Sequence, residues 1–366
     1  MLERRGSFHF NWWYLGLILS ISIMGVFMIY SANQGRPEPY FQKLYIRQIY
    51  WIGAGLAALL VAVYFDYRLL SRYAYLIYLL TLIALVVVLF FGVTVSGSKR
   101  WLQIGPINLQ ISEMAKLSMV IVLAKYFETS KPSGQYELRD LVLPAMLTGA
   151  MGWLIYKQPD LGTAMILGAV FFMYVIAVEL KPSTLFRLLG ACAAFAPMGW
   201  FFLKDYQKAR ILTFLNQEMD PLGAGYQTIQ SKIAIGSGGF WGKGLLAGTQ
   251  SRLNFLPEKH TDFIFSVFAE EMGFFGVAVL LTLFLILLLK GLNIAHRSAD
   301  RFGLFLAIGI TGYLGFYIIY NLGMTVGIFP ITGIPLPLFS YGGSSLITTY
   351  FALGLLMNIE ARRSML

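Results

Sequence analysis

Residues 256–276 read LPEKHTDFIFSVFAEEMGFFG, a polar, charged approach that runs directly into an apolar segment extending to residue 289. An apolar run of this length is long enough to cross a bilayer as a helix. Carboxylates within such a helix are costly and usually face a protein interior or a water-filled cavity. Asp262 at the polar boundary, and Glu270 and Glu271 beyond it, are therefore the first candidate functional residues.

Helical geometry separates these three acids. Eight residues would place Glu270 about 12 Å beyond Asp262 along the helix axis and about 80° around it. We expect Asp262 to be an accessible base at the external membrane surface. The alternative is an acid at the N-cap or in the first turn, where the helix dipole favours it. Glu270 and Glu271 lie deeper and are interpreted as supports of the helix bundle.

The composition indicates a polytopic membrane protein. Of the 366 residues, 57% are hydrophobic and 13% are charged, whereas soluble globular domains carry roughly 25% charged residues. The net charge of +10 does not indicate nucleic acid as a partner, because the basic residues are dispersed through loops and form no basic module with interleaved aromatics. It favours membrane lipids with anionic headgroups or an anionic lipid substrate. The single cysteine, Cys192, excludes an intramolecular disulfide.

Apolar stretches of spanning length recur ten times along the chain. They cover residues 12–30, 46–65, 73–92, 109–127, 140–156, 161–180, 185–203, 262–289, 302–324 and 339–359. The short loops on the side of both termini hold most of the Lys and Arg residues, which predicts cytoplasmic termini. We therefore expect an all-α polytopic membrane protein with about ten transmembrane helices. Residues 1–366 would form a single transmembrane domain, with a large extracytoplasmic loop at residues 204–261 between helices seven and eight.

Within that loop, residues 236–244 read GSGGFWGKG. Glycine at this density permits sharp turns or close approach of the backbone to a ligand. The segment lacks the Gly-Lys-Ser or Gly-Lys-Thr of a nucleotide-phosphate loop, so it is either a phosphate cradle of another kind or a structural re-entrant loop. The chain has no internal repeat, which leaves an inverted-repeat transporter without support from the sequence.

A second group of candidate residues begins with Lys99, Arg100 and Trp101, which are predicted on the external side. A cationic pair beside an aromatic ring suits a diphosphate-bearing lipid. Glu113 and Lys116 follow three residues apart and share one helix face. They either line an active site or fix the helix packing as a buried ion pair.

Two later motifs also belong to the external side. Asp160, in QPDLGT at 158–163, stands at the start of a helix and is either its cap or a site residue. Residues 333–345, GIPLPLFSYGGSS, contain prolines and glycines that break a helix. Broken backbone at membrane depth is tolerated where it packs in protein or lines a cavity. This loop, which includes Ser344, is predicted to close an external cavity or to dock a partner.

The predicted site combines these motifs with the charged residues before Asp262, among which His260 is placed to orient the Asp262 carboxylate. Asp262 is the predicted catalytic residue. The predicted lining residues are Lys99, Arg100, Trp101, Glu113, Lys116, Asp160, Glu258, Lys259, His260 and Ser344.

Six motifs then occur in a fixed order. They are KRW at 99–101, QISEMAK at 110–116, QPDLGT at 158–163, FLPEKHTDFIF at 255–265, AEEMGF at 269–274 and PLPLFSYGGSS at 335–345. Together they resemble the SEDS family (shape, elongation, division and sporulation), from the first predicted helix to the last. The segments AIGSGGF at 234–240 and GTQS at 248–251 are more similar to the rod-shape branch of the family than to its division branch. Ile111 departs from the family pattern, in which proline is expected.

The resemblance implies ten helices and a peptidoglycan glycosyltransferase that polymerises lipid II during cell elongation in the bacterial cytoplasmic (inner) membrane. It also implies a class B penicillin-binding protein transpeptidase and other membrane proteins of the elongation complex as partners. By position, Asp262 matches the essential acid of the family, and Glu113 with Lys116 matches its buried ion pair.

The implied reaction has definite chemical needs. Forming a glycosidic bond from a sugar diphosphate requires a base for the proton of the acceptor hydroxyl and positive charge for the departing diphosphate. Asp262 offers the base, while Lys99, Arg100 and Lys116 offer the charge. A divalent cation, Mg²⁺ or Mn²⁺, held by Asp262 is an alternative way to share this task, and no organic cofactor is expected. One external carboxylate without a second close acid predicts an inverting displacement.

Two other functions remain open at this point. A lipid II flippase or other lipid transporter is one, because intramembrane charges also line transport paths. A non-catalytic scaffold for morphogenesis is the other. A transporter needs charged groups deep in a path open to both sides, whereas a polymerase needs an external base. The clustering of charges at the external helix ends argues against a scaffold.

Overall fold

The computed structural model of the chain describes residues 10–34, 38–95, 98–105, 107–130, 135–217, 220, 223–252, 256 and 258–363. Ten helices within these residues coincide with the predicted spans. They are α1 (Trp12–Asn33), α3 (Leu44–Tyr64), α4 (Arg68–Phe91), α5 (Ile111–Thr129), α6 (Leu138–Lys157), α7 (Leu161–Ala177), α8 (Pro182–Phe202), α12 (Ile264–His296), α13 (Arg301–Thr325) and α14 (Gly343–Arg362). In the described part of the chain, six helices are long and apolar enough to cross a membrane by length and composition alone. These six are α1, α3, α4, α6, α12 and α13.

A small antiparallel sheet, which the sequence did not predict, joins α4 to α5. Its strands β1 (Val93–Val95), β2 (Ser98–Ile104) and β3 (Ile107–Gln110) lie in the order β1-β2-β3. Trp101 pairs with Gln110 across β2 and β3. Two of the strands are too short to show the alternation of apolar and polar residues that predicts a strand. The sheet brings the motif around Arg100 next to the start of α5.

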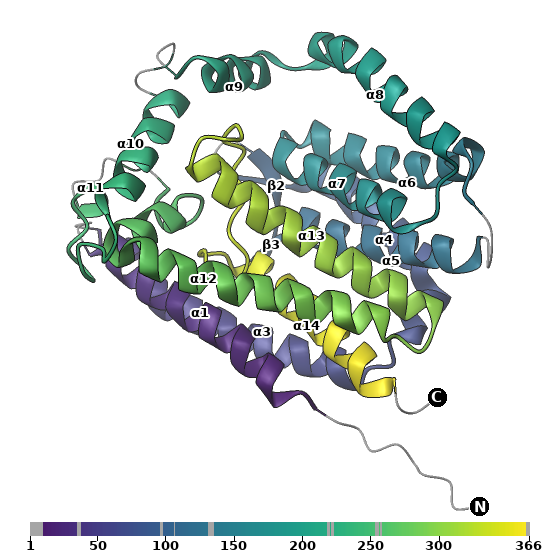
Figure 1. Cartoon of the computed structure of the whole chain (residues 1–366), viewed down its shortest axis with the longest axis horizontal. Helices are drawn as coiled ribbons and strands as arrows, with labels where there is room; N and C mark the ends of the chain where they lie inside the picture. Colours follow the sequence, from purple (N-terminus) through teal and green to yellow (C-terminus); the bar gives the residue numbers. More distant parts are fainter. Residues whose placement is uncertain are drawn as a thin grey trace, which may run out of the picture.

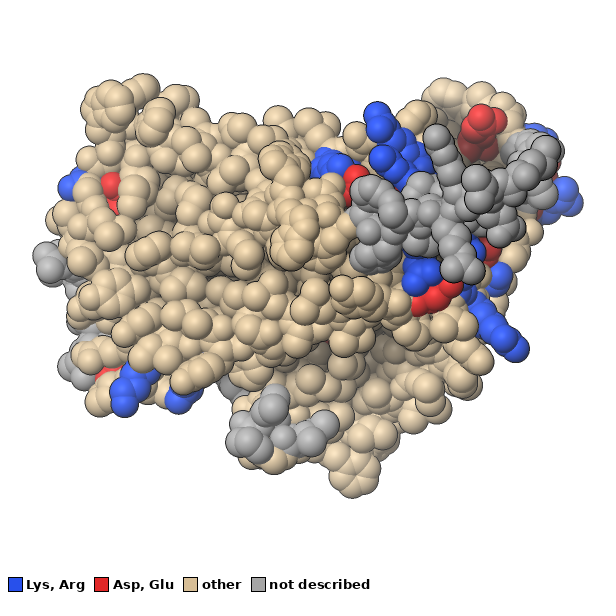
Figure 2. All heavy atoms as spheres, turned by 90° about the horizontal axis from the view of Figure 1, so that it is seen from below, with Lys and Arg blue, Asp and Glu red and all other residues tan. Residues whose placement is uncertain are grey.

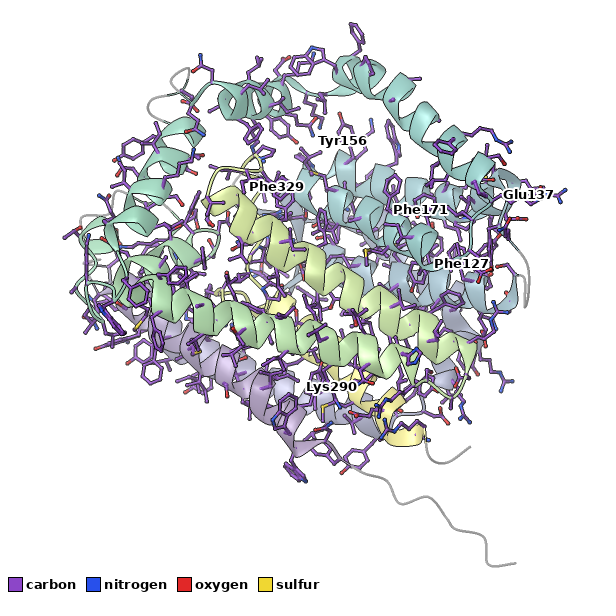
Figure 3. All side chains as sticks on the ribbon, in the orientation of Figure 1. Phe127, Glu137, Tyr156, Phe171, Lys290 and Phe329 are labelled. Carbon is purple, nitrogen blue, oxygen red and sulfur yellow. The ribbon has the colours of Figure 1, made fainter. Side chains whose placement is uncertain are left out.

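Helix α13 lies at the centre of the bundle, against α5, α7 and α12 (Figure 1). The hydroxyl of Tyr174 on α7 hydrogen-bonds to the carbonyl oxygens of Val120 on α5 (2.9 Å) and Phe305 on α13 (3.0 Å). Phe127 stacks on Tyr174 with ring centroids 5.5 Å apart, and side chains fill the space between these helices (Figure 3). Packing and interhelical hydrogen bonds of this kind hold helices together in a membrane, where lipid is as apolar as the side chains.

The outer helices present apolar side chains to the surroundings. On α4, Leu76, Leu79, Leu80 and Ile83 are all exposed. Figure 2 shows an uncharged band across the middle of one face, with Lys, Arg, Asp and Glu towards the two ends. A surface of this kind suits the hydrocarbon core of a bilayer.

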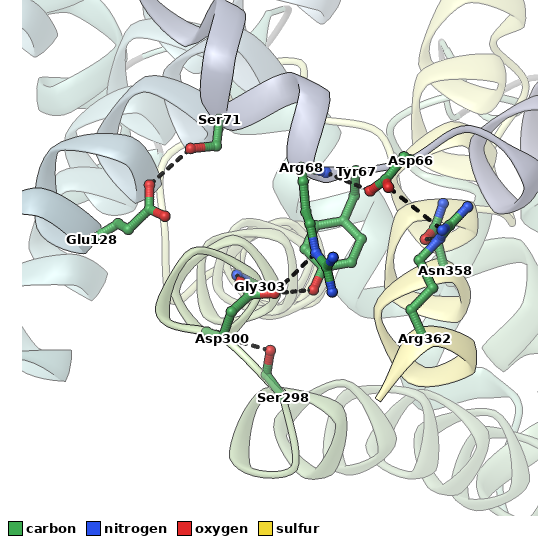
Figure 4. A network of polar contacts seen from close by, with 10 residues as sticks. All are labelled: Asp66, Tyr67, Arg68, Ser71, Glu128, Ser298, Asp300, Gly303, Asn358 and Arg362. Atoms are coloured by element: carbon green, nitrogen blue, oxygen red, sulfur yellow. Dashed lines mark hydrogen bonds and ion pairs between the residues drawn. The ribbon is translucent and has the colours of Figure 1, made fainter. Parts of the chain in front are cut away.

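Polar contacts hold together the end of the bundle that carries both termini (Figure 4). The hydroxyl of Tyr67 donates a hydrogen bond to Asp300, and Arg68 Nε lies 3.8 Å from Asp300 Oδ2. Arg362 on α14 pairs with Asp66 at 3.5 Å. The loops after α3 and α12 and the last turn of α14 are thereby tied to one another. Arg4 and Arg5, which contributed to the predicted orientation, lie outside the described residues.

Residues 204–261, predicted as the large loop between helices seven and eight, contain helices of their own. The segment contains α9 (Asp205–Leu215), α10 (Ala224–Ser237) and α11 (Thr249–Arg252). Together with α8 they arch along one edge of the bundle (Figure 1). Helix α10 packs on α12 and α13, whereas Thr184 is the only buried side chain among those described on α8. The four-residue helix α2 (Pro39–Gln42) precedes α3.

The predicted start of the eighth span is also corrected. Helix α12 begins at Ile264, so Asp262 lies in the preceding turn and not on the helix. The carbonyl oxygen of Glu258, a residue with a φ of 48°, accepts hydrogen bonds from the amides of Thr261 and Asp262, both at 3.1 Å. Because this turn is closed by backbone geometry, the apolar pattern gave no sign of it. The helical spacing expected between Asp262 and Glu270 therefore does not apply.

Gly273 marks a kink in α12, where φ is 64° and ψ is −167°. Residues 236–244 pack against this kink, and the amide of Gly244 donates to the carbonyl oxygen of Glu271 at 2.9 Å. A Cβ atom on Gly242 would lie 2.1 Å from that same carbonyl oxygen, so the approach requires glycine. These contacts favour a structural role for the glycine segment over a phosphate cradle.

Candidate active site

A cavity of about 940 Å³ opens at the end of the bundle opposite the termini. Its walls come from α3, the sheet, the start of α5, the turn between α6 and α7, α9, the turn before α12, α13 and the loop before α14. The lining residues with polar side chains include Arg47, Arg100, Trp101, Gln110, Glu113, Asp160, Arg210, Glu258, His260, Asp262, Tyr317 and Ser344. Segments far apart in the sequence thus meet around one space.

Asp262 lies half-buried in this cavity. Its main chain is fixed by Asn321 on α13, whose Nδ2 donates to the carbonyl oxygens of Asp262 (3.0 Å) and Ile334 (2.7 Å). Loss of solvent, and to a smaller extent the charge of Glu258, raise the pKa of the Asp262 carboxyl, which is about 7 once all of its surroundings act. A carboxyl with a pKa near neutrality is matched to general-base catalysis.

Two arginines oppose these effects on Asp262. The positive charges of Arg100 and Arg210 act to lower the pKa of the carboxyl, as does a hydrogen bond with the side chain of Thr261. Both guanidinium groups line the cavity, together with that of Arg47. The cavity therefore combines one carboxylate poised near neutrality with fixed positive charges.

Arg100 is held in place by Asp160. The two side chains form an ion pair at 3.2 Å, and Asp160 is buried. Asp160 also caps α7, accepting hydrogen bonds from the amide of Thr163 (3.1 Å) and its hydroxyl (2.9 Å). Ser112 on α5 donates a further hydrogen bond to Asp160 Oδ2 at 3.2 Å. The residue that caps α7, as one of the two interpretations predicted, thus also positions an arginine of the cavity.

Glu113 and Lys116 form a buried ion pair at 2.7 Å on the first turns of α5. Lys116 also donates a hydrogen bond to the hydroxyl of Tyr317, and its Nζ lies 4.3 Å from the centre of that ring. Glu113 and Tyr317 line the cavity, whereas Lys116 is not among the residues that do. The expected direct contact between Lys116 and a diphosphate is therefore not supported by this geometry.

The remaining predicted residues differ in their placement. His260 lines the cavity with its ring between those of Phe41 (5.7 Å) and Tyr341 (5.9 Å), so aromatic packing sets its orientation. Glu258 is exposed at the cavity, while Lys259 is buried and is not among the lining residues.

On the sheet side, Trp101 lines the cavity. Ser344 accepts a hydrogen bond from the amide of Gln110 at 3.3 Å, which joins the start of α14 to β3. Lys99 lies on β2 opposite Thr94, and its side chain lies outside the described part of the structure.

The loop before α14 forms one wall, which agrees with its predicted role in closing the cavity. Ser340 anchors it, donating from Oγ to the carbonyl oxygen of Thr261 at 2.6 Å and accepting at Oγ from the amide of Leu336 at 2.8 Å. Gly333 of this loop has a φ of 75°, and a Cβ atom there would lie 3.5 Å from Asp262 Oδ2. The loop backbone therefore passes directly beside the carboxylate.

Glu270 and Glu271 lie outside the cavity and bind neighbouring segments, as their interpretation as bundle supports requires. Glu270 Oε1 lies 2.7 Å from Lys243 Nζ and accepts hydrogen bonds from the amides of Thr249 (2.8 Å) and Gln250 (3.1 Å). Glu271 Oε1 accepts a hydrogen bond from the hydroxyl of Ser31 on α1 at 2.5 Å.

The cavity residues missed by the sequence reasoning include two arginines and a tyrosine. Arg210 belongs to a basic stretch of residues 204–261, and Arg47 lies at the start of the second apolar stretch, but neither is part of a local motif. Tyr317 lies within an apolar span and gives no polar signal. Only the packing of α3, α9 and α13 around one space reveals them.

A divalent cation was an alternative expectation for Asp262. Among the described residues there is no group of three or more His, Cys, Asp or Glu side chains able to hold a metal ion. Mg²⁺ is commonly bound by one or two carboxylates together with substrate phosphates. Asp262 and Glu258 line the same cavity and fit such a shared arrangement, but they do not form an all-protein cage.

The fold is that of a known class of membrane protein. Residues 11–365 match the model of the cell cycle protein family of FtsW, RodA and SpoVE, and the chain belongs to this family. The resemblance to the SEDS family and the predicted all-α polytopic membrane fold are thereby confirmed.

The relatives carry names from both branches of the family. The chain is 41% identical over 359 residues to peptidoglycan glycosyltransferase MrdB of Escherichia coli (strain K12), covering 96% of this chain and 93% of that protein. It is 33% identical to peptidoglycan glycosyltransferase RodA of Treponema pallidum (strain Nichols), covering 98% and 99%. A probable peptidoglycan glycosyltransferase FtsW of Geobacter metallireducens is 36% identical, covering 94% and 93%.

Solved structures agree with the fold. A chain from work on structural coordination of polymerization and crosslinking by a peptidoglycan synthase complex aligns with a TM-score of 0.82 at 36% identity, covering 98% of this chain and 99% of that one. The crystal structure of the rod shape determining protein RodA of Thermus thermophilus aligns with a TM-score of 0.71 at 31% identity, covering 97% of each chain. The expected similarity to the rod-shape branch is confirmed.

Proposed function

We propose that this protein is a peptidoglycan glycosyltransferase that polymerises lipid II in the cavity around Asp262. The observation that carries the proposal is the presence, in one cavity, of a carboxyl with a pKa of about 7 and three arginines. The relatives named peptidoglycan glycosyltransferase, which match over nearly the whole chain, support the reaction class.

The proposed reaction is a direct displacement. The Asp262 carboxylate takes the proton of the acceptor sugar hydroxyl as its oxygen attacks the anomeric carbon of the donor. The bond from that carbon to the lipid diphosphate breaks, and the diphosphate leaves with the bonding electron pair. Arg47, Arg100 and Arg210 stabilise the negative charge of the leaving group.

The pairing of the other cavity acids supports an inverting course. Glu113 is paired with Lys116 and Asp160 with Arg100, so neither is a free nucleophile. Glu258 is exposed, and its charge acts on Asp262 by raising the pKa. With Asp262 as the base, the acceptor hydroxyl itself is the nucleophile, and the configuration at the anomeric carbon inverts. Asp262 would hold a Mg²⁺ or Mn²⁺ ion if one binds, and the ion would supply further positive charge for the leaving group.

The proposal also assigns a setting. The protein lies in the bacterial cytoplasmic (inner) membrane with both termini cytoplasmic, which leaves the cavity on the external side. A class B penicillin-binding protein is the proposed partner, supported by the similarity to a chain of a peptidoglycan synthase complex. The polyprenyl tail of the substrate would lie between helices open to the lipid.

The test is polymerisation of purified lipid II by the protein together with its transpeptidase partner, with and without a chelator. Asp262→Ala should abolish glycan formation without lowering the melting temperature or weakening partner binding. Robust polymerisation by this variant would remove Asp262 from the reaction. Transfer of lipid II across vesicles without any polymer would favour a flippase instead.

A further inference from the structure

Tyr317 stands between the buried ion pair on α5 and the cavity. Lys116 is fully enclosed, and its ammonium group contacts Glu113 and the hydroxyl of Tyr317. Tyr317 lines the cavity, but Lys116 does not. The hydrogen bonds of this lysine therefore reach its two partners and not a ligand in the cavity.

The hydrogen-bonding capacity of the groups decides the direction of this contact. A lysine ammonium has three donors and no acceptor, whereas a tyrosine hydroxyl has one donor and can also accept. Lys116 must therefore donate, and Tyr317 must accept through its oxygen. The hydroxyl proton of Tyr317 is left over, and no hydrogen bond from it to an acceptor is found among the described residues. It is available to a group in the cavity.

The position of the hydroxyl is well defined. The ring of Tyr317 packs edge-on against Tyr313, with centroids 6.1 Å apart, and Lys116 lies over its face at 4.3 Å. Tyr317 lies eight residues before the end of α13, which is about 12 Å along the helix axis. It therefore contributes to the deep wall of the cavity, on the membrane side.

A cation that donates to a hydroxyl polarises it and makes its own proton a better donor. Such a group favours an anionic acceptor over a neutral sugar hydroxyl. Glu113 offsets part of the lysine charge, so the contact delivers a directed hydrogen bond into the cavity without leaving a bare ammonium there.

We propose that Tyr317 is a substrate-binding residue that donates its hydroxyl hydrogen bond to the diphosphate of the lipid-linked sugar and so conveys the charge of Lys116 to it. This inference rests on the proposed function, because it assumes a lipid diphosphate in the cavity. It assigns to the Glu113–Lys116 pair an indirect role in binding, through a residue on another helix. No proton is transferred, since Tyr317 keeps its proton throughout.

The test compares Tyr317→Phe with Tyr313→Phe in the purified complex with the transpeptidase partner. The first variant keeps the ring against Lys116 and removes only the hydroxyl. The second removes the hydroxyl of a neighbouring buried tyrosine that does not line the cavity. Tyr317→Phe should lower kcat/KM for lipid II by ~10- to 100-fold, the size of one lost hydrogen bond to a charged group. Tyr313→Phe should leave it near the wild-type value.

A binding measurement separates a ligand contact from a packing role. Wild-type protein should bind undecaprenyl diphosphate more tightly than undecaprenyl monophosphate, and Tyr317→Phe should lose most of that preference with an unchanged melting temperature. Equal kcat/KM in Tyr317→Phe and wild type would overturn the inference. So would a loss that falls equally on both lipids and accompanies a lower melting temperature.

The dependence on Lys116 is tested in a Lys116→Met background. If Tyr317 acts through Lys116, adding Tyr317→Phe there should lower diphosphate binding by less than about twofold further, because coupled residues are not additive. If Tyr317→Phe lowers diphosphate binding as much in the Lys116→Met background as in wild type, Tyr317 acts without Lys116. If wild-type protein forms no glycan, the proposed function fails, while the two-lipid binding comparison still decides the role of Tyr317.

Discussion

Asn321 on α13 holds the main chain of Asp262, because its Nδ2 donates to the Asp262 carbonyl oxygen at 3.0 Å. The same nitrogen donates to the carbonyl oxygen of Ile334 at 2.7 Å. One buried amide therefore joins the turn that carries the proposed base to the loop that forms the cavity wall beside it. The distance between base and wall is set by a helix at the centre of the bundle.

Asn321→Ala should lower both stability and activity. The change leaves the carbonyl oxygens of Asp262 and Ile334 without this donor, at a cost of about 1–3 kcal/mol for a buried acceptor left unpaired. The turn and the loop would no longer be held to each other, so polymerisation per folded molecule should fall. Thermal unfolding in detergent and lipid II polymerisation measure the two effects.

Asn358 offers a matched control at the other end of the bundle. It is also buried, and its Nδ2 donates to the carbonyl oxygens of Ala62 (2.7 Å) and Phe65. Asn358→Ala should destabilise the fold to a similar extent but leave the activity of the folded protein intact. If the two variants lose activity equally, Asn321 has no special link to the site.

The kink at Gly273 predicts different costs for two glycines that both have positive φ. Gly242 (φ 80°) has no room for a Cβ atom, whereas Gly239 (φ 58°) has nothing within 4 Å of that position. Alanine at either position destabilises the fold by about 1 kcal/mol, because it must adopt the left-handed conformation. Only Gly242→Ala also pushes residues 236–244 away from α12. Its melting temperature should fall well below that of Gly239→Ala, and similar values would argue against a tight backbone contact.

The sequence predicts those parts of the fold and site that carry a local signal. Asp262, Asp160 and the Glu113–Lys116 pair are charged residues at the ends of apolar spans, and the cost of placing a charge there makes them conspicuous in the sequence itself. The ten helices follow from the length of the apolar runs. The cap that Asp160 provides for α7 is also local and was predicted as one of two alternatives.

The rest depends on contacts that no local pattern encodes. Arg210 and Tyr317 reach the cavity only because α9 and α13 converge on it. The turn at Glu258 and the kink at Gly273 are backbone conformations stabilised by partners elsewhere in the chain. Placing Asp262 on a helix was wrong because the apolar run begins directly after it, at Phe263, whereas the helix begins only at Ile264.

The raised pKa of Asp262 predicts the pH dependence of activity. A base must be unprotonated to accept the acceptor's proton, so polymerisation should increase as the pH rises through about 7. Glu258→Gln removes a negative charge that raises this pKa, and the rise in activity should shift to lower pH. The measurement is the initial rate of lipid II polymerisation from pH 5 to 9. An unchanged profile in Glu258→Gln would mean that a group other than Asp262 sets it.

The same pKa determines how Asp262 affects stability. Activity should increase as the pH rises, whereas the stability that Asp262 contributes should decrease. Its carboxyl has an ordinary pKa of 3.8 and a folded pKa of about 7, so between these values the folded state binds more protons than the unfolded state. The contribution of this residue to the free energy of unfolding is therefore fully present below pH 3.8 and is lost as the pH rises through 7. Asp262→Asn cannot ionise and avoids that loss. The melting temperature of the variant minus that of wild type should increase between pH 4 and 7 and stay constant above pH 7, even though the variant is inactive. A difference in melting temperature that does not change with pH would mean that the carboxyl ionises as easily in the folded protein as in the unfolded chain. That result would remove the physical basis for Asp262 as a base with a pKa near neutrality.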